Sequence, residues 1–242
     1  MSFKDIFNID AEVKESAHAR VNLIGEHTDY TGGYVMPTLL SFKNTIEITE
    51  NNSNEFIVYS EHFKEKKEFN NFKKSTDNEW VDYIKGCLHI FFEENKISSK
   101  FLNIFISSNI PLERGISSSS ALCVATLKAL NTFFETNIKD QEIAKLAKKV
   151  EFNYIGVSGG IMDQMVSSIG IHGKAFFMNC KNLEYELINF PENWKFCLID
   201  SEVQRNLRDS SYNERFAELQ EAEKKTWCRI FGGSKKREFS NR

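Results

Sequence analysis

The sequence predicts an α+β fold. Stretches of β-forming residues and stretches with apolar residues at helical spacing both occur along the chain. The two kinds do not alternate strictly, as they would in a doubly wound parallel sheet. The 242 residues, of which 41% are hydrophobic, are enough for one large domain or a domain and a half.

The N-terminal third is predicted to contain the first strands. Residues 2–19 predict a short helix followed by a loop. Two strands are expected at Thr45–Thr49 and Glu55–Ser60, with a turn at 51–54 between them. The polar segment 61–78 is expected to form an exposed hairpin arm or loop.

The rest of the chain is expected to contain most of the helices. Apolar residues recur at helical spacing over Trp80–Glu94. The other predicted helices are Ser117–Phe134, Asp140–Tyr154 with Asp140 as its N-cap, Ile161–Ser168 and Arg208–Lys225. The other predicted strands are Phe101–Ile106, Lys174–Met178, Glu184–Ile188 and Lys195–Asp200.

Composition argues against several classes of function. The formal net charge of −3 gives no reason to expect nucleic-acid binding, and no apolar run reaches the length of a membrane span. The N-terminus lacks the basic-then-apolar layout of a signal peptide, so a cytoplasmic location is expected. The five cysteines are scattered, without metal-ligand spacing, and are expected to be buried thiols in a reducing compartment.

The first candidate site is the segment Arg20–Gly33. An apolar stub, Val21–Ile24, is followed by three polar side chains within four positions, namely Glu26, His27 and Asp29. Two carboxylates and an imidazole can hydrogen-bond the vicinal hydroxyls of a ligand. The alternative is a strand end and a turn, with Asp and Gly present only for turn chemistry.

The second candidate site is a serine-rich loop before a predicted helix. Gly115 allows close approach of the backbone, and Ser117, Ser118, Ser119 and Ser120 stand where the helix starts. The N–H groups and the dipole of a helix start attract phosphate, and serine hydroxyls can donate to phosphate or bind Mg²⁺. The alternative is an ordinary serine N-cap.

The third candidate is Asp163, in the small-residue segment 156–164. Its alternative role is to stabilise a helix start electrostatically. Paired with a cation such as Arg20, it could accept the proton of a hydroxyl nucleophile while the cation keeps it ionised. Glu151, on the preceding predicted helix, is a candidate second metal ligand or a solvated glutamate.

Together these segments resemble the galactokinases, of the GHMP small-molecule kinase family. The resemblance covers roughly residues 16–220 and is nearly continuous over Arg20–Gly33. Gly115 and Ser117–Ser119 match the family's phosphate-binding motif, and Gly160–Gln164 matches its catalytic-aspartate segment. The resemblance implies a GHMP kinase fold, with the N-terminal domain over residues 1–200 largely complete and a C-terminal domain starting over 201–225.

The resemblance also assigns roles. Asp163 and Arg20 would be catalytic, ATP with Mg²⁺ would bind at Gly115, Ser117, Ser118 and Ser119, and Ser119 would contact the metal. The residues implied to contact the sugar are Glu26, His27, Asp29, Gly160, Asp163 and Tyr212. Tyr212 could instead be a tyrosine at the edge of the core.

Two features depart from the family pattern. Glu113 adds a negative charge to the phosphate loop and is expected to weaken nucleotide binding unless it points outward or pairs with Arg114. From Thr226 the chain has five basic residues, one acidic residue and no family motif. We interpret residues 226–242 as an aberrant tail, a frameshift product or mis-joined gene end, with most of the C-terminal domain missing.

The resemblance implies ATP-dependent phosphorylation of galactose at its anomeric hydroxyl, giving galactose 1-phosphate. One alternative is a non-catalytic regulator that binds galactose and ATP. The other is an N-acetylgalactosamine kinase, since the four-serine run followed by Ala121 resembles that branch. The sequence leaves the oligomeric state open, with a monomer as the default.

Overall fold

The computed structural model describes residues 1–76, 79–111, 114–199 and 211–226. Its strands are β1 (Val13–Asn22), β2 (Tyr34–Val35), β3 (Pro37–Glu50), β4 (Phe56–Ser60), β5 (Glu65–Phe69), β6 (Leu102–Ser108), β7 (Lys174–Asn179) and β8 (Tyr185–Asn189). Its helices are α1 (Phe3–Phe7), α2 (Val81–Asn95), α3 (Ser118–Phe133), α4 (Asp140–Lys149), α5 (Met162–Ile169) and α6 (Ser211–Thr226).

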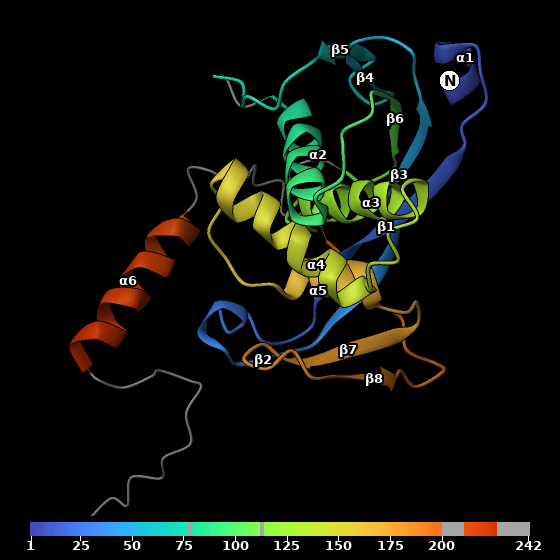
Figure 1. The fold of residues 1–242 in the computed structure, drawn as a ribbon. Helices are drawn as coiled ribbons and strands as arrows, with labels where there is room; N and C mark the ends of the chain where they lie inside the picture. The colour runs from blue at the N-terminus through green and yellow to red at the C-terminus, as the bar shows by residue number, and fades with distance from the viewer. Residues whose placement is uncertain (77–78, 112–113, 200–210, 227–242) are drawn as a thin grey trace, which may run out of the picture.

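The strands form one mixed sheet that the helices cover unevenly (Figure 1). The strand order is β2-β7-β3-β6-β4-β5, with β1 also paired to β3 and β8 to β7. The β4–β6 pair is parallel, and the other pairs are antiparallel. The expected α+β class is therefore confirmed.

The main core lies between this sheet and helices α2, α3 and α4. Successive side chains of a strand point to opposite faces, and the core uses one face of β3 and β6 through Ile46, Ile48, Ile104 and Ile106. On the other face of β6, Phe105 packs with Tyr59 and with Phe3 of α1. One face of the sheet is thus covered by the helices that also form the site described below, and α1 covers part of the other face beside β4 and β6.

Most predicted elements are confirmed within a few residues of their ends, and two are wrong. Residues 2–19 were expected to be a short helix followed by a loop, but β1 begins at Val13 and pairs with β3 from Val13↔Ile48 onward. Residues 195–199 were expected to be a strand, but they are irregular and mostly exposed, and residue 200 lies outside the described part. In the described part of the chain no strand pairs with them, and an unpaired segment lacks ladder hydrogen bonds.

The helix predicted over Asp140–Tyr154 changes type part of the way along. It is α-helical over α4 and π-helical over Val150–Ile155, and it ends at Gly156 in the left-handed conformation. The expected N-cap is also wrong, since Lys139 holds that position and Asp140 is the first helical residue. π-Helical turns are frequent at functional sites because they redirect side chains.

The cysteine prediction is confirmed only in part. Cys87 and Cys123 are buried, Cys180 is partly buried, and Cys197 is exposed. Cys228 lies outside the described residues. Among the residues that the structure describes, no helix has both the length and the apolar character needed to cross a bilayer.

Candidate active site

The loop after β1 holds the first group of candidate residues. Gly25 has φ of 105°, and a Cβ there would lie 2.4 Å from the carbonyl oxygen of Tyr34, so glycine is required. The Thr28 hydroxyl lies 2.7 Å from the carbonyl oxygens of both Gly25 and Tyr34 and fixes the loop against β2. The threonine and the glycine here therefore shape the loop that carries the charged residues.

Glu26, His27 and Asp29 all lie on this loop, in different environments. Glu26 and His27 are exposed, and Asp29 is partly buried. His27 has φ of 62°, and its Nδ1 lies 2.7 Å from the hydroxyl of Tyr30. The His27 ring therefore has a hydrogen-bond partner on its own loop.

Asp29 packs directly against Gly160, which precedes α5. A Cβ on Gly160 would lie 2.1 Å from Asp29 Oδ2, so no larger residue fits there. Burial raises the pKa of Asp29 to about 6, and the negative charge of Asp163 acts in the same direction. Arg20 and Lys148 act in the opposite direction. The loop after β1 and the segment before α5 thus meet at Asp29, a carboxyl group whose pKa of about 6 lies close to neutral pH.

The phosphate-loop candidate lies at the N-terminus of α3. Ser117 occupies the N-cap position but has φ of 62°, and its side chain makes no capping hydrogen bond. Its hydroxyl instead donates to Asp163 Oδ2. The ordinary serine N-cap is therefore not what forms here, and the first N–H groups of α3 have no partner within the helix.

Arg20 and Asp163 form a two-point ion pair. Arg20 Nε lies 2.6 Å from Asp163 Oδ1, and Nη2 lies 2.7 Å from Oδ2. Arg20 Nη1 donates to the Gly115 carbonyl oxygen at 3.0 Å. Burial lowers the pKa of Arg20, but Asp163 and other nearby carboxylates outweigh it and leave the pKa raised. One guanidinium therefore joins β1, the phosphate loop and α5.

Only 4% of the surface of Glu151 is exposed, so it is not a solvated helix glutamate. The Ser119 hydroxyl lies 2.7 Å from Oε1, and the Ser120 hydroxyl 2.8 Å from Oε2. The side-chain amide of Gln164 also donates to Oε2. Burial raises the pKa of Glu151, and these three hydrogen bonds oppose the shift.

Three residues of this arrangement received no individual role from the sequence. Ser120 and Gln164 contact Glu151, and Lys148 donates from Nζ to the Gly159 carbonyl oxygen at 2.5 Å. A partial signal for Lys148 was available, because residues three apart on a helix share a face and Lys148 stands three before Glu151. Gln164 adjoins Asp163 in the matched segment.

For two predicted residues the structure describes no side chain, and a third, Ser118, lies at the start of α3. Tyr212 falls within α6, but its side chain lies outside the described residues, as does Glu113. Ser118 is the first residue of α3, and its carbonyl oxygen accepts from Asn44 at 2.9 Å. Phe216 of α6 contacts Tyr30, with ring centroids 5.5 Å apart, so α6 borders the loop that bears His27.

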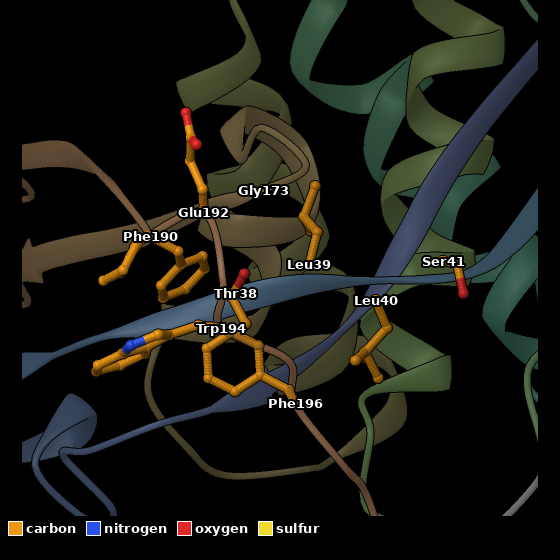
Figure 2. Close-up of a pocket in the computed structure, with 10 residues that line it drawn as sticks. Thr38, Leu39, Leu40, Ser41, Gly173, Phe190, Glu192, Trp194 and Phe196 are labelled. Atoms are coloured by element: carbon orange, nitrogen blue, oxygen red, sulfur yellow. The ribbon is translucent and has the colours of Figure 1, made fainter.

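A hollow of about 400 Å³ lies elsewhere, between β3 and the segment after β8. Figure 2 shows the rings of Phe190, Trp194 and Phe196 gathered beside Thr38. The Phe190 and Phe196 rings pack with centroids 4.7 Å apart. None of the predicted site residues lines this hollow. The chemistry-bearing residues are therefore collected at the Arg20–Asp163 pair and not here.

Comparison with known families agrees with this arrangement. Residues 82–170 match the GHMP kinases N-terminal domain, and residues 1–49 match the galactokinase galactose-binding signature. The second match includes Arg20 and the hydroxyl-binding candidates. The first includes the phosphate loop, Glu151 and Asp163.

Relatives point the same way. A galactokinase of Thermotoga petrophila is 38% identical over 210 residues, which cover 86% of this chain and 59% of that protein. The crystal structure of Lactococcus lactis galactokinase complexed with galactose matches with a TM-score of 0.81 and 32% identity, over 94% of this chain and 60% of that one. The Methanococcus jannaschii mevalonate kinase, at 23% identity and a TM-score of 0.63, shares the fold.

The sheet with its covering helices has the GHMP kinase fold, and residues 82–170, which match the N-terminal domain of that small-molecule kinase family, contain Asp163 of the Arg20–Asp163 pair. The galactose-binding signature and the relatives named above make the chain similar to the galactokinases of that family. The chain spans about 59% of the length of the curated galactokinase from Thermotoga petrophila.

Proposed function

We propose that this chain provides the sugar- and phosphate-binding part of a galactokinase. The reaction would transfer the γ-phosphoryl group of ATP to the anomeric hydroxyl of galactose and give galactose 1-phosphate. The observation that carries this proposal is the Arg20–Asp163 pair, with distances of 2.6 and 2.7 Å, placed beside the N-terminus of α3. The names of the similar proteins support the choice of sugar.

Asp163 is the proposed acceptor of the sugar hydroxyl's proton, or the group that orients that hydroxyl. A hydroxyl becomes a better nucleophile when a positioned carboxylate accepts its proton in the transition state. Arg20 would hold the carboxylate in place through two hydrogen bonds and add positive charge near the phosphoryl group. Most of the rate enhancement would then come from positioning and electrostatics.

The remaining sugar contacts are proposed at Glu26, His27, Asp29, Gly160 and Tyr212. Asp29 and Gly160 pack against each other, so that both would border the sugar on the same side of the site. Glu26 and His27 are exposed on the same loop, where a ligand can reach them.

The nucleotide phosphates are proposed to bind at Gly115 and Ser117–Ser119. Gly115 has φ of 70° and open space around its Cα, so that a ligand can approach the backbone closely. The helix start adds unpaired N–H groups and a partial positive charge. Both features favour an anion of high charge.

The residues at Glu151 fit a magnesium ion. The donors there are a carboxylate and the Ser119 hydroxyl, which are oxygen ligands of the kind that Mg²⁺ takes. The described part of the chain contains no larger cluster of His, Cys, Asp and Glu, so substrate phosphates would have to supply further ligands. When bound, Mg²⁺ neutralises phosphate charge, and Ser119 and Glu151 would hold it.

The decisive experiment is a phosphoryl-transfer assay on the full 242-residue chain, with galactose 1-phosphate detected by ³¹P NMR. We expect galactose-dependent product that Asp163→Asn abolishes, whereas the exposed control Asp10→Asn leaves it unchanged. Galactose binding measured by calorimetry without turnover would favour a non-catalytic regulator. A preference for N-acetylgalactosamine over galactose in the same assay would favour the kinase of that sugar. If the chain shows no galactose binding and no turnover, the proposal is overturned.

A further inference from the structure

Lys148 lies in the last turn of α4, and its side chain points into the site. Its Nζ lies 2.5 Å from the Gly159 carbonyl oxygen and 5.6 Å from the centre of the Phe152 ring. The side chain is partly buried. Its neighbours on the same helix differ, since Lys145 and Lys149 pair with Glu142 and Glu94 at the surface. Lys148 is therefore the lysine of this helix end that faces the carboxylates.

The carbonyl that Lys148 binds belongs to the residue before Gly160. Gly160 is the glycine that packs against Asp29 so closely that an added Cβ would lie 2.1 Å from Oδ2. A hydrogen bond from a charged donor to Gly159 fixes the peptide that leads into this contact. A change in the position of Lys148 would therefore also change how Gly160 packs against Asp29.

Lys148 also adds charge to this region. The carboxylates of Glu151, Asp29 and Asp163 all interact with it, and burial lowers the pKa of Lys148 against their effect. Arg20 is already engaged by both oxygens of Asp163. Arg20 and Lys148 both favour the ionised form of Asp29, and of these two cations Lys148 is the one that is not bound to Asp163 by two hydrogen bonds.

We propose that Lys148 is a positioning residue of the sugar site, which fixes Gly159 and Gly160 against Asp29 and supplies the charge that lets Asp29 accept a sugar hydroxyl. This inference rests on the proposed function. It differs from a purely structural role, in which a lysine at a helix C-terminus stabilises the helix dipole and nothing else. A structural role predicts a change in folding stability without a change in the pH dependence of sugar binding.

The pH dependence of galactose affinity should follow the ionisation of Asp29. The groups that face it from its own turn and from the surrounding elements are Tyr30, Arg20 of β1, Lys148 of α4, Asp163 of α5 and Cys180 after β7. Since an ionised carboxylate accepts hydroxyl hydrogen bonds, galactose should bind more tightly as the pH rises through about 6. Removal of the Lys148 charge raises the pKa of Asp29, so the rise in affinity should move to higher pH.

The test is calorimetric titration of galactose into the full chain from about pH 5 to about pH 8. We expect Lys148→Met to move the transition upward by about one pH unit, which weakens binding about fivefold at the parent's transition near pH 6. Lys148→Arg, which keeps the charge, should retain the parent transition, and Lys145→Met is the matched control. The arginine variant and the thermal midpoints separate a loss of fold from a loss of charge.

Two outcomes would count against the inference in different ways. If the parent binds galactose and Lys148→Met binds with the same affinity and pH dependence, the role of Lys148 is wrong and the proposed function stands. If the parent chain binds no galactose at any pH, both proposals are overturned.

Discussion

Arg20 donates two hydrogen bonds to the two carboxylate oxygens of Asp163, a residue 143 positions further along the chain. The same guanidinium binds the Gly115 carbonyl oxygen through Nη1. The Ser117 hydroxyl completes the arrangement by donating to Asp163. Arg20 of β1 thus contacts both the phosphate loop, at Gly115, and the proposed catalytic aspartate, Asp163. The relative positions of these three segments depend on this one side chain.

Replacement of Arg20 by lysine should show that this geometry matters as well as the charge. A lysine keeps the positive charge but cannot form the two parallel hydrogen bonds. We expect Arg20→Lys to lower kcat for galactose phosphorylation by about 100-fold with a smaller change in KM. Steady-state kinetics measure both constants, and a variant with the parent kcat would show that the two-point contact is not needed.

Gly160→Ala should disturb the contact between Gly160 and Asp29 in the proposed sugar site. The new methyl group would lie 2.1 Å from Asp29 Oδ2 and 2.3 Å from Cγ, so that either the loop or α5 must shift. We expect a loss of about 2 kcal/mol in the free energy of unfolding and a large loss of galactose affinity. The control is Gly173→Ala, where φ is +76° but the space around the Cα is open, so only backbone strain is added.

Denaturant unfolding and calorimetry measure the two quantities. Equal losses of stability in Gly160→Ala and Gly173→Ala, with sugar binding intact in both, would contradict the contact between Gly160 and Asp29. The comparison therefore separates a clash at the site from a general cost of replacing glycine.

Asp29→Asn should stabilise the fold while it removes sugar binding. Because the pKa of Asp29 is raised to about 6 in the folded chain, the unfolded chain ionises first as the pH rises. The folded state therefore binds more protons between the two pKa values, and stability falls as the pH rises through that window. At pH 7 we expect the Asp29→Asn variant to gain about 1 kcal/mol in the free energy of unfolding.

The gain should vanish at about pH 4, where Asp29 is protonated in the folded chain. Unfolding curves at both pH values measure it, alongside Asp10→Asn as an exposed control. A gain that is the same at both pH values would have a cause other than the charge of Asp29. No gain at pH 7 would contradict the raised pKa.

Glu151→Gln should uncouple nucleotide binding from magnesium. The glutamine keeps the shape of the side chain but removes the charge that would hold the ion with Ser119. We expect ATP affinity in the variant to respond at least about tenfold less to added Mg²⁺ than in the parent. Titration of ATP with and without EDTA measures this response. Glu142→Gln, an exposed change in the preceding helix α4, should respond as the parent does.

The sequence located most elements because their patterns are local. The helices over α2 and α3 have apolar residues at helical spacing, and both form where expected. The strand β1 was missed because its sequence mixes lysine, glutamate and histidine with few β-branched residues, and it forms through pairing with β3. The strand predicted over residues 195–199 is the opposite case. These residues favour a strand by type, but in the described part of the chain no strand lies beside them to pair with.

The candidate site was predicted in its residue types but not in its contacts. Asp163, Arg20 and Ser117 were each identified from short motifs, yet the direct Ser117–Asp163 hydrogen bond was not expected. Glu151 had a solvated alternative that its burial contradicts. The roles of the individual residues in sugar, nucleotide and metal binding stay predictions.

By itself, the sequence determined which chemical groups are present and in what order, because motif residues a few positions apart are constrained by local backbone geometry. Only the tertiary structure decided which of these groups meet. Packing of α3, α4 and α5 on one sheet brings Lys148 to Gly159, and it buries Glu151 among Ser119, Ser120 and Gln164. Contacts between residues so far apart in the chain depend on how the core packs, which no local pattern records.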